Sequence, residues 1–183
     1  MRLIRRIVSQ LHRYVMWALL SAVLWAWIFL SFVLDTVPAK KVTIYTDTAS
    51  VRDTALEMLL SRSLPAGIRM VKVHPFSYAA FDAGAPNGSD LYILPASELT
   101  ENLGVLCPMD AHGADDYVSD GAVYGWRVYD AASGKGAAAA YLGYAPDEDC
   151  YLCAAKSSGH LGAWNGSKDS AAIAIAEQII ALP

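Results

Sequence analysis

Residues 89–103, Ser-Asp-Leu-Tyr-Ile-Leu-Pro-Ala-Ser-Glu-Leu-Thr-Glu-Asn-Leu, decide the fold because they place a strand directly before a helix. Leu91 to Leu94 is an apolar run that follows a Gly- and Ser-containing loop, which predicts a strand. Ser97 to Leu103 has the composition of a short helix, and Gly104 ends it. A strand that leads into a helix is typical of α/β domains.

The residues before this stretch extend the same pattern toward the N-terminus. Val42 to Thr46 is rich in β-branched and aromatic residues and predicts a strand. Ser50 and Asp53 resemble a capping box at the start of a helix, which Pro65-Ala66-Gly67 ends. Ile68 to Val73 is another predicted strand. The order strand, helix, strand, loop, strand indicates parallel pairing of these three strands.

The residues after this stretch predict antiparallel pairing instead. Gly121 to Asp130 and Ala137 to Tyr144 are apolar, aromatic-bearing runs, and we expect them to form a hairpin around a loop that contains glycine. Tyr151 to Lys156 is a further predicted strand, and Ser167 is expected to cap a closing helix. The predicted fold class is therefore α/β, with a mixed sheet.

An uncharged apolar segment from Tyr14 to Leu34 precedes the domain. At about 1.5 Å of rise per residue, a helix of this length covers about 30 Å, the thickness of the hydrocarbon core of a bilayer. We expect a transmembrane helix at 14–34, preceded by a basic N-terminus at 1–13. A linker at 35–41 then leads to the α/β domain at 42–183.

The charges divide at the same place along the chain. Residues 1–34 carry four arginines and no acid, whereas residues 35–183 hold 10 basic and 18 acidic residues, a net charge of −8. The positive-inside rule predicts a cytoplasmic N-terminus and an extracytoplasmic domain. An acidic domain is a poor partner for nucleic acid. The expected partners are the bilayer at 14–34 and either other membrane proteins or a small solute.

A cleaved secretory signal is the alternative interpretation of the N-terminus. Val37-Pro38-Ala39 offers a small residue at a suitable spacing for cleavage. The apolar segment is longer than the 7 to 15 or so residues of a typical signal peptide, which favours a permanent anchor.

The chain holds three cysteines, and two of them form a Cys-x-x-Cys motif at Cys150 and Cys153. This spacing is typical of thiol-disulfide oxidoreductases. The preceding acids at 147–149 would raise a thiol pKa, and a strand would place the two side chains on opposite faces. A structural disulfide from Cys107 to Cys150 or Cys153, or three buried thiols, are the other interpretations.

The remaining patterns predict neither a cofactor nor a metal site. His74, His112 and His160 are scattered, and none is paired with a cysteine at the spacing of zinc ligands. The four aspartates between 110 and 120 do not follow the spacing of an EF-hand loop. There is no Gly-x-Ser-x-Gly motif. We therefore expect a domain without catalytic residues.

An aromatic row lies within the predicted strand at 121–130. Tyr124, Trp126 and Val128 alternate along the chain and therefore share one face of that strand. The row could stack on a ligand, or it could pack the sheet against its helices.

Three stretches together resemble the extracellular solute-binding proteins of bacterial ABC importers: Ser89 to Glu98, Val105 to Asp110 and Asp120 to Val128. The resemblance implies one three-layer α/β lobe on a membrane stalk, because the chain is about half as long as a two-lobed member. It further implies a ligand surface at the carboxyl ends of the strands, formed by Thr46, Asp47, Pro95, Ala96, Ser97 and Trp126.

The function expected from these observations is a membrane-anchored extracytoplasmic binding or interaction module. The alternatives are a membrane-tethered thiol-disulfide oxidoreductase that uses Cys150 and Cys153, and a structural subunit of a membrane complex.

Overall fold

The computed structural model describes residues 2–32, 37–46, 53–75, 88–142 and 146–182. The chain divides into two compact units, Met1–Val37 and Pro38–Pro183. The predicted turn at 47–49, the capping residue Ser50 and the candidate ligand residue Asp47 lie outside the described residues.

The first unit contains one helix, α1 (Arg2–Phe32). Twelve of its large apolar side chains are between 49% and 71% exposed, from Leu11 to Phe29. Four of them are consecutive at 14–17, so they point in directions about 100° apart and surround the helix. Within the described residues, no helix meets the combined length and hydropathy of a membrane-spanning segment.

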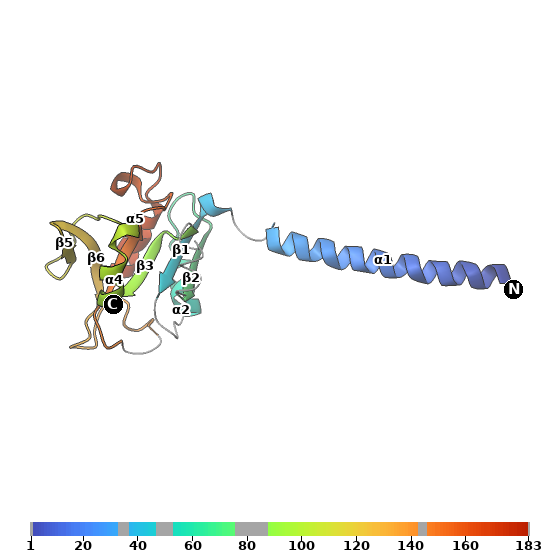
Figure 1. Ribbon diagram of the computed structural model, residues 1–183, viewed down its shortest axis with the longest axis horizontal. Helices are drawn as coiled ribbons and strands as arrows, with labels where there is room; N and C mark the ends of the chain where they lie inside the picture. Colours follow the sequence, from blue (N-terminus) through green and yellow to red (C-terminus); the bar gives the residue numbers. More distant parts are fainter. Residues whose placement is uncertain (1, 33–36, 47–52, 76–87, 143–145, 183) are drawn as a thin grey trace. The chain divides into compact units, whose positions relative to one another are not determined.

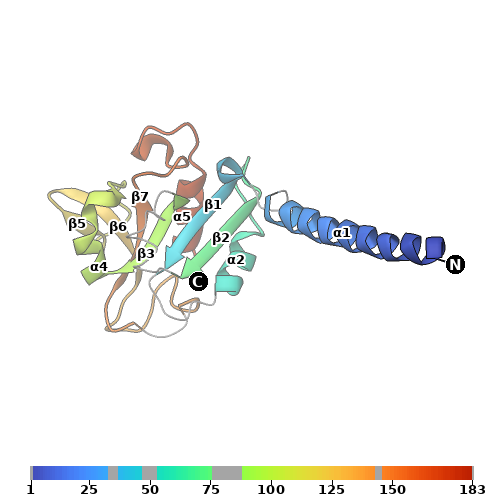
Figure 2. The same ribbon diagram turned by 45° about the vertical axis from the view of Figure 1, so that its right-hand side comes forward.

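The second unit is built on a seven-stranded mixed sheet, shown in Figures 1 and 2. Its strands are β1 (Lys41–Thr46), β2 (Met70–Pro75), β3 (Leu91–Pro95), β4 (Leu106–Cys107), β5 (Tyr117–Ser119), β6 (Ala122–Tyr129) and β7 (Cys150–Ala155). Its helices are α2 (Asp53–Leu60), α4 (Ala96–Glu101) and α5 (Ala171–Ile180), with short 3₁₀ turns η1 (Pro38–Lys40), η3 (Leu103–Val105) and η4 (Gly162–Trp164). The α/β class with a mixed sheet is confirmed.

The strand order β2-β1-β3-β7-β6-β5 joins a parallel half to an antiparallel half. Strand β1 pairs in parallel with β2 and β3, as the sequence predicts. Strand β7 runs antiparallel to both β3 and β6, and β4 also pairs with β7. The strand β3 therefore stands at the boundary between the two halves.

Side chains alternate between two apolar clusters on the faces of the sheet. Leu91 and Ile93 of β3 belong to the larger cluster, together with residues from α2 and α5. Tyr92 and Leu94 belong to the smaller cluster, together with Leu99 of α4. Because β3 is buried on both faces, its sequence is a continuous apolar run rather than an alternating one.

The predicted hairpin of 121–130 with 137–144 is wrong. The strand β6 does form, but residues 137–142 are in turns and donate Ala138 N–H to the carbonyl of Val128. The true hairpin partner of β6 is β5, joined by Asp120-Gly121 with φ of 49° and 78°. An Asp-Gly pair with two positive φ angles suits a tight hairpin turn, whereas four successive alanines at 137–140 have little strand preference.

The predicted caps also differ from the structure. The closing helix α5 begins at Ala171 after Ser170, which makes no side-chain cap bond. The hydroxyl of Ser167 instead accepts the N–H of Gly162 at 2.7 Å and so closes the preceding loop. The helix α2 ends at Leu60, several residues before Pro65.

Gly136 supports the loop that follows β6, and its replacement tests this part of the fold. It has φ of 152°, and an added Cβ would lie 2.7 Å from Tyr129 Cα and closer still to the carbonyl oxygen of Val128. We expect Gly136→Ala to lower the free energy of unfolding by about 3 kcal/mol or more.

Gly134→Ala is the matched control for this prediction. Gly134 also has a positive φ, of 66°, but an added Cβ meets no atom within 4 Å. Its cost should be only the strain of the backbone, about 1–2 kcal/mol. Equal losses in urea unfolding of the full chain in detergent would contradict the proposed backbone clash.

Candidate functional site

The residues predicted to bind a ligand do not form one surface in the structure. Thr46 is 1% exposed at the end of β1. Ser97 is exposed on α4, and its N–H donates to the carboxylate of Glu148 at 3.0 Å. Pro95 and Ala96 are partly buried at the junction of β3 and α4.

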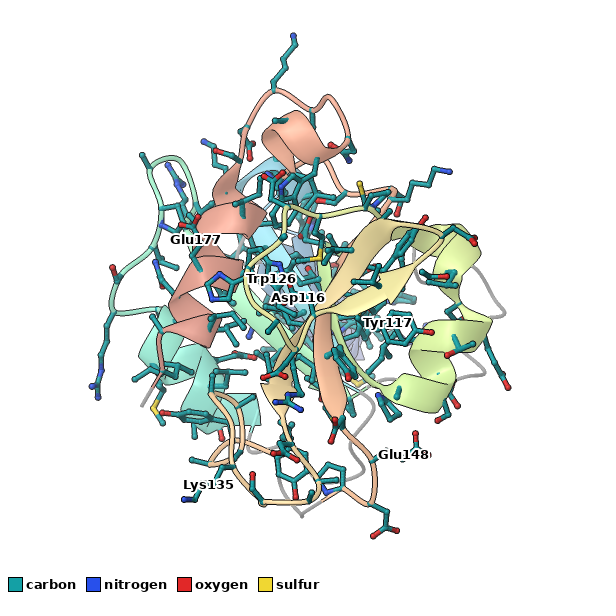
Figure 3. All side chains as sticks on the ribbon, turned by 90° about the vertical axis from the view of Figure 1, so that its left-hand side faces the viewer. Asp116, Tyr117, Trp126, Lys135, Glu148 and Glu177 are labelled. Atoms are coloured by element: carbon teal, nitrogen blue, oxygen red, sulfur yellow. The ribbon has the colours of Figure 1, made fainter. Side chains whose placement is uncertain are left out.

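The predicted stacking role of Trp126 is wrong, because its indole is a core side chain. Trp126 is 4% exposed and belongs to the larger apolar cluster. Its Nε1–H donates to the carbonyl of Asp110 at 2.8 Å, and its ring meets Trp164 edge-on with centroids 5.4 Å apart. Figure 3 labels Trp126 near the middle of the view and Lys135 and Glu148 toward its edge. The other interpretation of this aromatic row, in which Trp126 packs the sheet against its helices, agrees with the structure.

Of the interpretations left open for the cysteines, the structure has three free, buried thiols and no disulfide from Cys107 to Cys150 or Cys153. Cys150 and Cys153 belong to different apolar clusters on opposite faces of the sheet, so they cannot form a Cys-x-x-Cys disulfide without rebuilding β7. Burial also raises the pKa of the Cys153 thiol far above its ordinary value. This geometry is opposite to that of a reactive dithiol.

The aspartates between 110 and 120 serve the local structure. Asp116 accepts the N–H groups of His112 and Gly113 at 2.6 and 3.0 Å, and Asp115 pairs with Arg127. Within the described part of the chain, no three histidine, cysteine or acidic side chains are grouped so that they could hold a metal ion.

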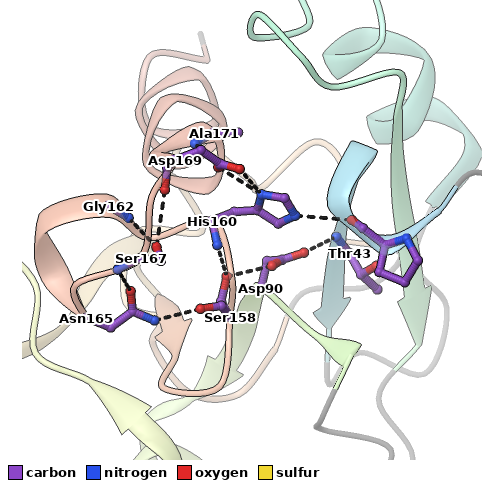
Figure 4. Close-up of polar contacts among 10 residues, drawn as sticks. Thr43, Asp90, Ser158, His160, Gly162, Asn165, Ser167, Asp169 and Ala171 are labelled. Atoms are coloured by element: carbon purple, nitrogen blue, oxygen red, sulfur yellow. Dashed lines mark hydrogen bonds and ion pairs between the residues drawn. The ribbon is translucent and has the colours of Figure 1, made fainter.

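A different set of polar side chains gathers where β1 and β3 begin. Ser89, Asp90, Ser158 and His160 are each at most 6% exposed, which is unusual for residues of these types. They come from two segments, the start of β3 and the loop after β7, which antiparallel pairing brings together. These residues form the centre of the candidate site, and Figure 4 shows Asp90, Ser158 and His160 with their polar contacts.

Asp90 has hydrogen-bond donors for both of its carboxylate oxygens. Oδ2 accepts the N–H of Thr43 at 2.8 Å, and Oδ1 accepts the hydroxyl of Ser158 at 2.6 Å. Burial raises the pKa of Asp90, while these two bonds and the charge of His160 act to lower it. The donors thus offset part of the cost of placing a carboxylate inside the domain.

His160 connects this centre to two further segments. Its backbone N–H donates to Ser158 Oγ at 3.0 Å. Its Nδ1 lies 2.8 Å from both carboxylate oxygens of Asp169, and its Nε2 lies 3.1 Å from the carbonyl oxygen of Pro38. In Figure 4 the imidazole ring stands between these two acceptors. Asp169 precedes α5, so one histidine joins the start of the domain to its last helix.

The pKa of His160 reflects opposing effects. Burial acts to lower it, but the hydrogen bonds to Asp169 and to the Pro38 carbonyl, and the charges of Asp90 and Asp169, raise it above its ordinary value. The charged ring is therefore favoured in the folded domain.

A cavity of about 510 Å³ lies over these residues. Its lining includes Lys41 and Tyr45 of β1, His74 of β2, and Pro38 and Ala39 of η1. Tyr45 packs against His74 with ring centroids 5.5 Å apart. The cavity thus combines an aromatic wall with charges of both signs, and it extends along one face of β1 from Lys41 at the amino end to Tyr45 near the carboxyl end.

The order Ser158, His160, Asp169 resembles a catalytic triad in composition but not in geometry. A triad needs an imidazole nitrogen that accepts the serine proton. Here the hydrogen bond from His160 to Ser158 Oγ comes from the backbone N–H and not from the imidazole ring. Both ring nitrogens face other partners. The arrangement suits binding and structural support rather than nucleophilic attack.

Sequence reasoning missed Asp90, Ser158 and Asp169 and treated His160 only as an unpaired histidine. Asp90 and Ser158 are 68 positions apart, so no short motif contains them. The available signal was an acid directly before a continuous apolar run, where a buried carboxylate would need donors.

Neither a protein-family model nor a curated protein matches the chain. Among solved structures, thiaminase I from Bacillus thiaminolyticus is similar at 19% identity and a TM-score of 0.31. The match covers 49% of this chain and 28% of that protein.

Replacement of Ser158 tests the support of the buried carboxylate. Ser158→Ala removes the donor to Asp90 Oδ1, so we expect the free energy of unfolding at pH 7 to fall by about 1–3 kcal/mol. The loss should shrink as the pH falls and Asp90 becomes protonated. Urea unfolding of the full chain in detergent measures both effects.

Ser170→Ala is the control, since Ser170 is exposed and makes no side-chain cap bond. Its effect should remain within about 0.5 kcal/mol. A Ser158→Ala variant as stable as Ser170→Ala would mean that Asp90 does not depend on this hydroxyl.

Proposed function

We propose that this chain is a membrane-anchored, extracytoplasmic binding module for a small polar solute and that it is not an enzyme. The observation that carries the proposal is the cavity of about 510 Å³ beside Asp90 and His160. Its volume is within the range of small-molecule sites, and buried hydrogen bonds hold its polar groups in place before a ligand arrives.

The chemistry of the lining supports a neutral or zwitterionic solute. Lys41 and Asp169 offer charges of opposite sign, and Tyr45 offers an aromatic surface. The net charge of −8 on residues 35–183 would repel a polyanion, which favours a solute without net negative charge. Because the cavity is open to solvent, little ligand surface can be buried, and we expect a Kd on the order of 0.1–1 mM.

The resemblance of three sequence stretches to solute-binding proteins of ABC importers also supports binding. In the proposal the chain keeps one lobe of such a protein, with its site over β1 and the loop after β7. A structural subunit of a membrane complex is the competing function. A structural subunit would co-purify with membrane proteins, and its melting temperature would not respond to any solute.

The membrane anchor in this proposal is α1 with the residues that follow it. The structure describes the side chains of α1 continuously over residues 13–29, slightly fewer than the about 20 residues that a spanning helix needs. The apolar sequence continues to Leu34. The exposed apolar side chains that surround the helix need an apolar environment, which the lipid supplies.

Tyr45 provides the test of solute binding. A panel of sugars, amino acids and short peptides at millimolar concentration should include a solute that raises the melting temperature of the full chain in detergent. We expect Tyr45→Ala to abolish this shift, because Tyr45 lines the cavity.

Tyr124→Ala is the matched control. Tyr124 is also a partly buried tyrosine that packs on the smaller apolar cluster, but it lines a separate cavity near Trp164. It should leave the shift unchanged. An equal loss in both variants, or no response to any solute, would contradict a binding site in this cavity.

Protease treatment of intact cells tests the topology independently. We expect an added protease to remove the domain while a tag at Met1 stays protected, because the four arginines before residue 14 favour the cytoplasmic side. A released soluble form that starts near Lys40 would instead favour a cleaved signal peptide.

A further inference from the structure

The segment that leads the chain into the domain, Pro38–Lys40, is weakly held. It forms the 3₁₀ turn η1, which has no buried residue. Besides the bonds of the turn itself, the Pro38 carbonyl accepts from His160, and the Lys40 carbonyl accepts the N–H of Arg69 at 2.8 Å. A segment without buried apolar area opens at low cost, so individual hydrogen bonds decide its position.

The partners of His160 determine how many protons its ring carries. Nδ1 faces a carboxylate and Nε2 faces a backbone carbonyl, and neither oxygen group has a proton to donate. A neutral imidazole has only one N–H, so it can satisfy one of these acceptors and directs a lone pair at the other. Only the doubly protonated ring makes both hydrogen bonds.

We propose that His160 is a pH-operated latch, which holds Pro38–Lys40 on the domain while its ring carries two protons and releases this segment when one proton leaves. The proton on Nδ1 is retained because it is bonded to the Asp169 carboxylate. The proton on Nε2 is lost, and the lone pair that remains on Nε2 then repels the oxygen of the Pro38 carbonyl. Since Pro38 and Ala39 line the cavity, release also opens one wall of the candidate site.

Charged groups from each neighbouring element set the pH at which the latch opens. Asp169 before α5 and Asp90 before β3 are acids that favour the protonated ring. Lys41 of β1 and His74 of β2 line the same cavity and, when charged, oppose it. Because the pKa of His160 is raised in the folded domain, the latch contributes fully below the unfolded value of 6.5. Its contribution is lost as the pH rises through the folded pKa.

Hydrogen exchange at the Arg69 amide reports the position of the segment, because this N–H bonds to Lys40. In the full chain in detergent, we expect its protection factor to fall about tenfold or more as the pH rises through the folded pKa of His160, since a charge-assisted bond is lost. The Asp90 amide, which donates to the Thr43 carbonyl inside the sheet, should keep its protection. Nitrogen chemical shifts of the His160 ring should show two protons below this transition and one above it.

Two variants keep the test decisive. His160→Gln should make the Arg69 protection independent of pH, and Asp169→Asn should move the transition to lower pH because it removes the carboxylate charge. His112→Gln, which replaces an exposed histidine that lines a separate cavity, should leave the transition in place. A neutral His160 ring at pH 6, or an Arg69 protection factor that does not change with pH in the unmodified chain, would overturn the proposal.

Discussion

The buried carboxylate of Asp90 constrains the whole domain, because a charge inside a protein must be met by donors from its surroundings. Thr43 and Asp90 are joined twice: the backbone N–H of Thr43 bonds to the Asp90 side chain, and the Asp90 N–H bonds to the Thr43 carbonyl. On the other side, Ala155 N–H donates to the Asp90 carbonyl, and Ser158 donates to its carboxylate. One residue thus ties the parallel pair β1–β3 to the antiparallel strand β7.

The charges near Asp90 form an alternating row of acid, imidazolium and acid. His160 lies between Asp90 and Asp169, so each group favours the ionised form of its neighbour. The row connects the sheet to α5 and to the segment where the chain enters the domain. The segment beside the cavity is therefore held by the same row of residues that surrounds the buried carboxylate.

The position of this cavity differs from the position that the sequence resemblance implies. Ligand sites in α/β folds usually lie at the carboxyl ends of the strands. Here the carboxyl end of β3 continues directly into α4, and Trp126 is sealed in the core by Asp110 and Trp164. The polar part of the cavity instead forms where the loop after β7, Ser157 to His160, meets the start of β3, and the aromatic part extends along β1 to Tyr45.

Local sequence preferences were enough to predict the strands at 42–46, 91–94 and 151–156, each within one residue of the observed bounds, and the parallel pairing of the first three strands. The two-residue period of a strand also predicted the separation of Cys150 from Cys153. The sequence did not determine the partner of β6, since the Asp120-Gly121 turn and the loop at 131–136 both fit a hairpin and only packing separates them. The burial of Trp126 and the grouping of Asp90, Ser158, His160 and Asp169 were decided by the tertiary structure alone. Asp90 is far from the other three residues in the chain, so the hydrogen bonds and charge interactions of this group form only when β7 brings them together away from water.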